Sequence, residues 1–288
     1  MTPRKRFLTM RPRPISYHKP TSLDQAIGLL DAKSVVLNGG QALLATLRMR
    51  VYNPDALVDI KHVPGLSAEV KVTDQSMEIG PRVTIENFLK TPDIRERMPI
   101  LYQAGQRLAD AQIRAQGTVV GSMCWADPRA NYPVAMLACD AVIHAQGKGG
   151  KRTIAADEFF LGFRANSLRQ EVVTKVTVPG PGRLGFSTYR EYSRQSNDVC
   201  IVNVAVAEID GKFRVAVGGV EKRPVLVSEA AELLTQKAGS ASAAKFMAIL
   251  DGKGLSPVED GHGAPEFRFN LVAEMLAEIA VDVSGGRT

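Results

Sequence analysis

The stretch of residues 35–50 constrains the fold most, because its pattern changes twice over a short distance. An apolar β-branched pair is followed by Gly39-Gly40, and leucines then recur at helical spacing, at Leu43 and Leu47. The pattern predicts a strand, a tight turn and a helix. Glycine permits a left-handed backbone and close approach of a ligand. The free N–H groups and the dipole at the start of such a helix favour an anion, which predicts a phosphate or pyrophosphate site.

The same glycine pair is also compatible with ordinary turn chemistry that binds nothing. It matches neither the G-x-G-x-x-G dinucleotide motif nor the G-x-x-x-x-G-K-[ST] phosphate loop. A second glycine segment, residues 118–122, follows some 80 residues later with a hydroxyl side chain at each end. Two such turns facing one another could hold the two phosphates of a dinucleotide, and from the residues alone both interpretations stay open.

The composition is that of a globular protein with a buried core, since 45% of the 288 residues are hydrophobic. No apolar run approaches the roughly 20 residues that a membrane-spanning helix needs, and the charged N-terminus lacks the apolar segment of a signal peptide. We therefore expect a cytoplasmic protein without a membrane span. Cys124, Cys139 and Cys200 are widely spaced, which predicts core thiols and no disulfide framework or Cys-ligated cluster.

The net charge of +6 raises the question of nucleic acid binding. The dense basic cluster lies within residues 4–13, in a proline-interrupted N-terminal extension of residues 1–13 in which Met10 is an alternative start. Elsewhere basic and acidic residues alternate. This distribution predicts a solvated surface or a face for an acidic protein partner, and no nucleic acid partner.

Local patterns divide the rest of the chain into three parts. In residues 14–66, Ser22 and Gln25 predict a capping box for a helix that runs to Leu30, and a strand follows residues 35–50 at residues 56–60, so the strands are expected to be parallel. In residues 67–182, strands are expected at 70–72, 77–79, 141–145 and 172–178, and helices near Thr84, from Pro99, and up to Leu137.

Residues 183–288 are expected to form strands followed by helices. The strands, at 199–209 and 213–217, are joined by Asp210-Gly211, a typical two-residue hairpin turn. The helices are expected at 228–236, 242–250 and 270–280. Because strands and helices occur in blocks and do not alternate strictly, the sequence predicts an α+β fold.

The sequence offers few candidates for acid–base or metal chemistry. The four histidines, at positions 18, 62, 144 and 262, fall in separate segments without metal-ligand spacing, so no metal site is expected. No G-x-S-x-G elbow is present, and the carboxylates are placed mainly where capping explains them. No catalytic side chain is predicted.

The order of motifs resembles the flavin-binding subunit of the molybdenum hydroxylases, the group that contains xanthine dehydrogenase and the medium chain of aerobic carbon monoxide dehydrogenase. The resemblance extends from about residue 17 to residue 280. It is carried by Tyr17 with Pro20, Gly39-Gly40, Leu43-Leu44, Leu47-Arg48, Val58-Asp59-Ile60, Gln116-Gly117-Thr118-Val119-Val120-Gly121-Ser122, Ala126-Asp127-Pro128, Tyr189, Arg194, Asp198 and Gly218-Gly219.

The resemblance implies two small FAD-binding α/β subdomains followed by a C-terminal domain of antiparallel strands and helices. It implies that both glycine segments cradle the FAD pyrophosphate, that Asn131 lies near the ribityl chain, and that four residues lie close to the flavin. The implied pyrophosphate cradle is Val36, Leu37, Asn38, Gly39, Gly40, Gln41, Ala42, Thr118, Val119, Val120, Gly121 and Ser122. The implied flavin neighbours are Leu108, Val173, Tyr189 and Glu191.

The resemblance also implies partners: a large subunit with a molybdopterin cofactor and a small subunit with [2Fe-2S] clusters, assembled as a dimer of heterotrimers. FAD on this chain would pass electrons to an external acceptor. Four residues depart from the family's usual ones: Ala42 replaces Ser, Val120 replaces Gly, Asn131 replaces Asp, and Glu191 replaces Lys. A valine resists a left-handed backbone, so the second segment is expected to be reshaped or Val120 to have β geometry. These departures leave a second hypothesis, a structural subunit of such a complex without flavin.

Overall fold

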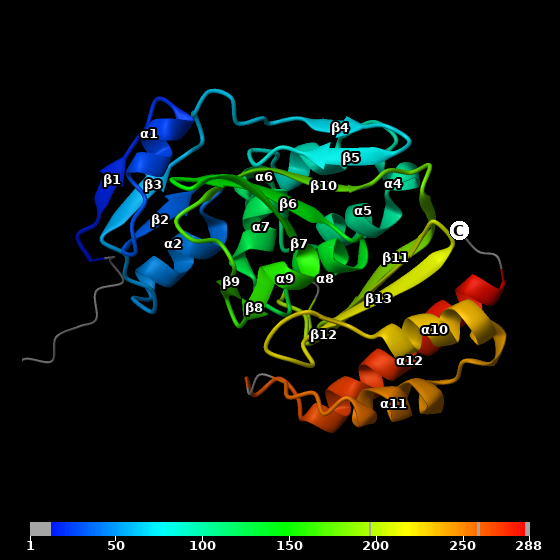
Figure 1. Cartoon of the computed structure of the whole chain (residues 1–288). Coiled ribbons are helices and arrows are strands. Elements are labelled where there is room, and N and C mark those ends of the chain that lie inside the picture. Colours follow the sequence, from blue (N-terminus) through cyan, green and yellow to red (C-terminus); the bar gives the residue numbers. More distant parts are fainter. Residues whose placement is uncertain (1–12, 196, 258–259, 286–288) are drawn as a thin grey trace, which may run out of the picture.

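The computed structural model describes residues 13–195, 197–257 and 260–285, so nearly all of the expected N-terminal extension, with Met10, lies outside the described residues. The first unit is a small three-layer arrangement with a parallel sheet in the order β1-β3-β2 (Figure 1). The expected parallel pairing is confirmed. The elements of this unit are β1 (Ser16–His18), α1 (Leu23–Gly28), β2 (Ser34–Leu37), α2 (Gln41–Arg48) and β3 (Ala56–Asp59).

Helix α1 begins as its sequence predicts. The Ser22 hydroxyl accepts the Gln25 N–H at 3.1 Å, and the Gln25 side chain reaches back to the Thr21 N–H at 2.6 Å. The first bond satisfies a donor of the first helical turn that has no intrahelical partner, and the second fixes the residue just before the N-cap. Ala26 and Ile27 then bury the inner face of the helix against the core of the first unit.

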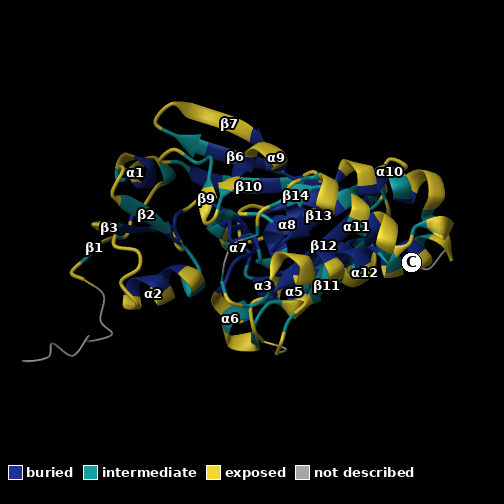
Figure 2. Cartoon of the chain, turned by 90° about the horizontal axis from the view of Figure 1, so that it is seen from below, coloured by how far each residue is buried: buried dark blue, intermediate teal, exposed yellow. Residues whose placement is uncertain are grey.

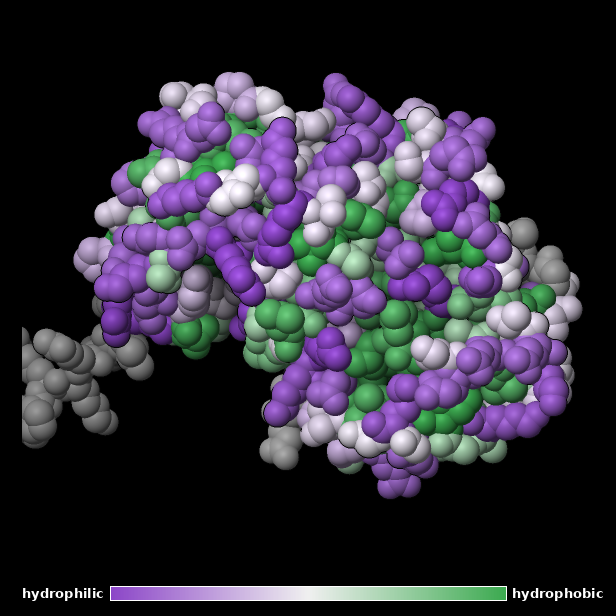
Figure 3. Space-filling view, in the orientation of Figure 1, coloured by the Kyte–Doolittle hydropathy of each residue, from purple (hydrophilic) through white to green (hydrophobic). Residues whose placement is uncertain are grey.

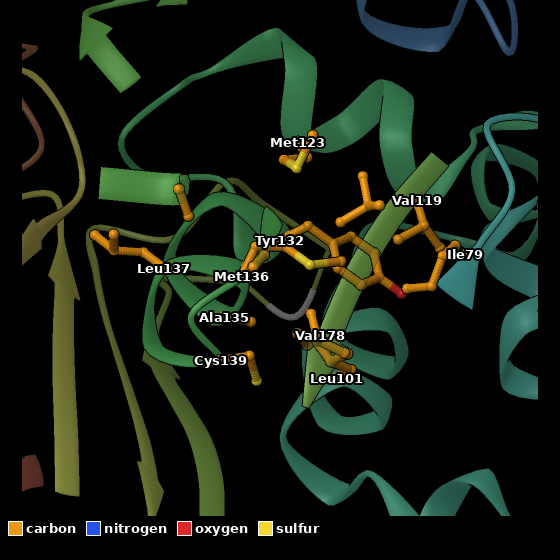
Figure 4. Packing of buried hydrophobic residues seen from close by; sticks show 14 of the residues in the cluster. Ile79, Leu101, Val119, Met123, Tyr132, Ala135, Met136, Leu137, Cys139 and Val178 are labelled. Carbon is orange, nitrogen blue, oxygen red and sulfur yellow. The ribbon is translucent and has the colours of Figure 1, made fainter. Parts of the chain in front are cut away.

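The second unit is a five-stranded antiparallel sheet in the order β4-β5-β10-β6-β7, covered on one face by helices. Figure 4 shows that Tyr132, Met136 and Met123 pack with Ile79 and Val178 of the sheet. Every residue from Tyr132 to Ala138 is buried, so this short helix forms the centre of the main core. The strands are β4 (Val70–Val72), β5 (Ser76–Ile79), β6 (Val142–Gly147), β7 (Gly150–Ala155) and β10 (Val172–Pro179), with the hairpin β8 (Phe160–Gly162) and β9 (Ala165–Asn166). The helices are α3 (Ile85–Leu89), α4 (Ile94–Arg97), α5 (Pro99–Arg107), α6 (Ala111–Gln116), α7 (Val119–Trp125), α8 (Asn131–Ala138) and α9 (Ala156–Phe159).

The third unit is an antiparallel sheet in the order β11-β12-β13-β14 with helices on both faces (Figure 2). Alternate residues of the central strand separate two cores, because successive side chains point to opposite faces. Val204 and Val206 face the C-terminal helices, whereas Ala205 and Ala207 join the core around α8. The elements are β11 (Leu184–Tyr192), β12 (Val202–Ile209), β13 (Lys212–Gly218), β14 (Val225–Leu226), α10 (Ser228–Lys237), η1 (Ala238–Ser240), α11 (Ala243–Gly252) and α12 (Pro265–Ser284).

The α+β class is confirmed, and so is the hairpin at Asp210-Gly211, where φ is +49° and +77°. Several boundaries differ from expectation. Strand β11 was not predicted, β12 begins three residues later than the expected 199, and α12 starts at Pro265 and not at 270. Proline at the first helical position explains the earlier start, since its missing N–H costs nothing there. Among the described residues, no helix is both long and apolar enough to cross a membrane.

Candidate functional site

The two glycine segments meet in the folded chain. The Asn38 side-chain amide donates to the Pro81 carbonyl at 2.7 Å and lies 3.5 Å from the Thr118 hydroxyl. The Gln41 amide donates to the Gly39 carbonyl and to the Gln116 side chain, both at 3.2 Å. The first unit and the second unit are therefore connected at the two segments that the sequence singled out.

Each residue of the glycine pair is required for a different reason. A Cβ atom at Gly39 would lie 2.4 Å from the Gln116 carbonyl oxygen and 2.9 Å from the Gly117 Cα, so only glycine allows the two backbones to pack this closely. Gly40 has φ +71° and is the N-cap of α2. A left-handed backbone is costly for any residue with a side chain, and glycine adopts it freely.

The start of α2 is open to an anion. Gly40 supplies no capping side chain, and the first helical hydrogen bond runs from the Leu44 N–H to the Gly40 carbonyl at 2.8 Å. The N–H groups of Gln41, Ala42 and Leu43 are therefore left without intrahelical partners. Ala42 is exposed, so a phosphate can reach these donors without help from a hydroxyl side chain.

The second glycine segment is not a turn, which corrects the sequence-based expectation. Residues 119–122 form the first turn of α7, and Thr118 is its N-cap. The Thr118 hydroxyl accepts the Gly121 N–H at 3.0 Å, and the Val119 N–H donates to the Val83 carbonyl at 3.1 Å. Most donors at this helix start are thus already used. Val120 has a helical backbone and is buried in the core, so it needs neither a reshaped turn nor β geometry.

A second polar cluster joins α8 to β11. The Glu191 oxygen Oε2 accepts the Asn131 side-chain amide at 2.6 Å and the Tyr189 hydroxyl at 2.8 Å. The Tyr189 hydroxyl accepts a further hydrogen bond from the Asn203 amide at 3.1 Å. Burial raises the pKa of the Glu191 carboxyl, although hydrogen bonds from Tyr189 and Asn131 and the charge of Arg107 act in the opposite direction. Three of the residues implied by the resemblance therefore form one connected group.

The remaining implied residues are placed differently. Leu108 follows the last residue of α5 and is half-buried, and Val173 lies on β10 with 6% of its surface exposed; both pack into the main core. No hydrogen bond joins either residue to the two polar groups within the described chain. Val36 and Leu37 lie on β2, and Ser122 is half-buried on α7.

Sequence patterns missed two parts of this region. Asn203 is fully buried on β12 and bonds the Arg129 and Ala130 carbonyls as well as Tyr189. Asn203 is the one amide side chain in an otherwise mainly apolar strand, and that contrast in the sequence could have indicated a buried polar role. The second part is a chain of buried ion pairs, in which Asp127 contacts Arg129, Arg129 contacts Asp260 at 2.8 Å, and Asp260 contacts the fully buried Arg268.

The comparisons with known proteins decide the family. The family model described as the FAD binding domain in molybdopterin dehydrogenase matches residues 13–181. The chain belongs to this family. The C-terminal domain of carbon monoxide dehydrogenase flavoproteins matches residues 187–283. This protein is therefore an FAD-binding subunit of an oxidoreductase of the molybdenum hydroxylase class.

Named relatives and a solved structure are similar to this chain over nearly its whole length. The nicotine 6-hydroxylase medium subunit of Paenarthrobacter nicotinovorans is 34% identical, over 95% of this chain and 98% of the relative. The carbon monoxide dehydrogenase medium chain of Hydrogenophaga pseudoflava is 28% identical, over 93% and 96%. The structure of quinoline 2-oxidoreductase from Pseudomonas putida 86 matches with a TM-score of 0.84 at 27% identity, over 96% of this chain and 99% of the matched chain.

The residues present fit an FAD pyrophosphate. The open N–H groups at the start of α2, the close backbone contact at Gly39 and the adjacent Thr118 cap provide a cradle made mainly of backbone. Figure 3 shows the first unit as a separate lobe, with the outline of the molecule indented between it and the rest. Within the described residues, no group of three or more His, Cys, Asp or Glu side chains could hold a metal ion.

Proposed function

We propose that this chain passes electrons from the iron–sulfur clusters of a partner subunit, through its FAD, to an external acceptor. The observation that carries the proposal is the contact between Asn38 and Thr118 next to the open start of α2. That arrangement gives a dinucleotide a binding site for its phosphates where the first unit meets the second. The flavin supplies the redox chemistry, and the protein binds, orients and tunes it.

The proposed site is divided between two groups of residues. The pyrophosphate would be held by residues 36–42 and 118–122, chiefly through backbone N–H groups, since the helix dipole of α2 favours an anion at Gln41 and Ala42. Leu108, Asn131, Val173, Tyr189 and Glu191 would lie along the ribityl chain and the flavin ring. We propose residues 14–66 and 67–182 as the two FAD-binding subdomains and 183–288 as the C-terminal domain.

The proposed partners are a large subunit with the molybdenum cofactor and a small subunit with [2Fe-2S] clusters, in a dimer of heterotrimers. The printed names of the relatives, a medium subunit and a medium chain, support an assembly of this kind. The cysteines support it as well, because Cys139 and Cys200 are buried and the three free thiols lie in separate segments, on α7, just after α8 and just before β12. Such thiols do not form the four-cysteine set that a [2Fe-2S] cluster needs, so the electrons would come from another chain.

A structural subunit without flavin is the alternative, and the exposed Ala42 favours it because a side-chain donor is missing there. Purification of the native complex separates the two hypotheses. The flavoprotein proposal expects absorbance near 450 nm and release of FAD by acid, in about equal amount to this chain. A complex that is complete in its three subunits but yields no flavin contradicts the proposal and supports the structural role.

A further inference from the structure

Glu191 is a half-buried acid that forms no ion pair with the described residues. Among the described residues no basic side chain forms a salt bridge with it, whereas the carboxylates of Glu78, Glu171 and Asp260 are each paired with a cation. Partial removal of a carboxylate from water makes its charged form less favourable when no cation pairs with it. A protein that keeps such a group without using it loses stability, so the position of Glu191 calls for a functional explanation.

The carboxylate of Glu191 is held in place but remains reachable by protons. Its Oε2 atom accepts both the Tyr189 hydroxyl and the Asn131 amide, which fixes the orientation of the group. Its Oε1 atom has no hydrogen-bond partner in the described chain and is not among the polar atoms that are sealed from solvent. A proton can therefore bind and leave at Oε1 while the two hydrogen bonds to Oε2 persist.

The groups that face Glu191 come from three sides. Tyr189 lies on its own strand, Arg107 at the end of α5, and Cys200 just before β12. Burial raises the pKa of both the Tyr189 hydroxyl and the Cys200 thiol, so these two remain neutral. Arg107 is exposed and keeps its charge. Glu191 is thus the group of this set whose charge changes between acid and neutral pH.

We propose that Glu191 is the ionisable group through which proton concentration sets the redox potential of the bound flavin. The inference rests on the proposed function, which places Glu191 beside the flavin. An ionised Glu191 opposes the arrival of electrons, because like charges repel and this repulsion is screened less at a half-buried position than in open water. Two electrons delivered with one proton would leave one added negative charge at the site. Glu191 would then take up one further proton from solvent at Oε1, where it forms the O–H bond of the carboxyl group.

The test is a reductive titration of the purified complex at a series of pH values from about pH 5 to about pH 9. The midpoint potential of the flavin is read from its visible spectrum against redox dyes. In the unsubstituted protein the slope of potential against pH should change where Glu191 titrates. Glu191→Gln should remove this change of slope and raise the potential at the alkaline end. Glu69→Gln is the matched control, because Glu69 is exposed and forms no ion pair with the part of the chain that the structure describes, and it should behave like the parent.

A second variant tests the role of Glu191 by changing Tyr189, which donates a hydrogen bond to it. Tyr189→Phe keeps the ring but removes one hydrogen bond to the carboxylate, so the change of slope should move to higher pH. A role that is merely structural would lower flavin content in either variant and leave the change of slope where it is. A Glu191→Gln protein that retains flavin and the parental change of slope overturns the inference. A parental complex without flavin overturns the proposed function instead.

Discussion

The side-chain amide of Asn38 lies 3.5 Å from the hydroxyl of Thr118, although 80 positions separate the two residues. The contact places the N-terminus of α2 beside that of α7, so two helices from different units begin at the same place. The helices are not equivalent there. Thr118 caps α7 with its own hydroxyl, whereas Gly40 leaves the donors of α2 unused. We therefore expect the start of α2 to contribute more to phosphate binding.

Replacement of Gly39 by alanine should weaken FAD binding while leaving the units folded. The new Cβ would meet the Gln116 carbonyl at 2.4 Å, so the two segments would have to separate. Overpacking of this kind costs about 1–3 kcal/mol, which corresponds to a loss of affinity of roughly five- to 150-fold if it falls on the bound state. Gly28→Ala is the control, since nothing lies within 4 Å of its added Cβ and a small gain in stability is expected. Equal flavin content in both variants would show that the close contact is not needed.

Replacement of Trp125 by alanine should loosen the first unit. Trp125 ends α7, packs against the cluster that contains Leu43 and Leu47 of α2, and has the Arg164 guanidinium 5.0 Å from its ring centre. Loss of a large, partly buried ring should lower the free energy of unfolding by roughly 2–4 kcal/mol and reduce flavin retention. Urea denaturation and the flavin-to-protein absorbance ratio measure both effects. Leu161→Ala, at a side chain that is 61% exposed, should change neither.

The buried ion pairs around Arg268 should matter more than an exposed pair. Arg268 is fully buried, contacts Asp260, and donates to the Ile201 and Gly219 carbonyls at 2.9 and 3.0 Å. Arg268→Met leaves Asp260 buried with one cation fewer, and should cost about 3–5 kcal/mol. Lys253→Met removes a surface pair with the exposed Glu229 and should cost about 1 kcal/mol or less. Chemical denaturation of the two variants compares these values, and similar losses would contradict the structural assignment.

Glu191→Gln should also change how stability depends on pH. Burial raises the pKa of Glu191 in the folded chain above its value in the unfolded chain. The unfolded state therefore releases this proton first, and the stability that the protonated group provides is lost as pH rises through the folded pKa. The variant should gain stability over the parent as pH rises, with little difference near pH 4, close to the ordinary pKa of glutamic acid, about 4.3. Thermal melting at several pH values measures the difference, and a constant offset would argue against a raised pKa.

Much of the local structure could be predicted because its causes lie within a few residues. The cap at Ser22, the hairpin at Asp210-Gly211 and the strand before Gly39 all follow from local hydrogen bonding and backbone freedom. Strand β11 could not be predicted in this way, since its exposed and buried side chains do not alternate cleanly and its pairing with β12 supports it. Residues 119–122 were misjudged because a short helix beginning with two valines depends on its buried position.

The sequence by itself determined the class of the fold, the family and the two segments proposed to hold a pyrophosphate. Tertiary structure decided how those segments are used: packing of the first unit on the second brings Asn38 to Thr118, and packing of β11 on α8 brings Glu191 to Asn131 across 60 positions. Such contacts join residues that are far apart in the chain, so their formation depends on how whole elements bury their apolar faces. No local pattern contains that information, and the environment that raises the pKa of Glu191 exists only once the elements have packed.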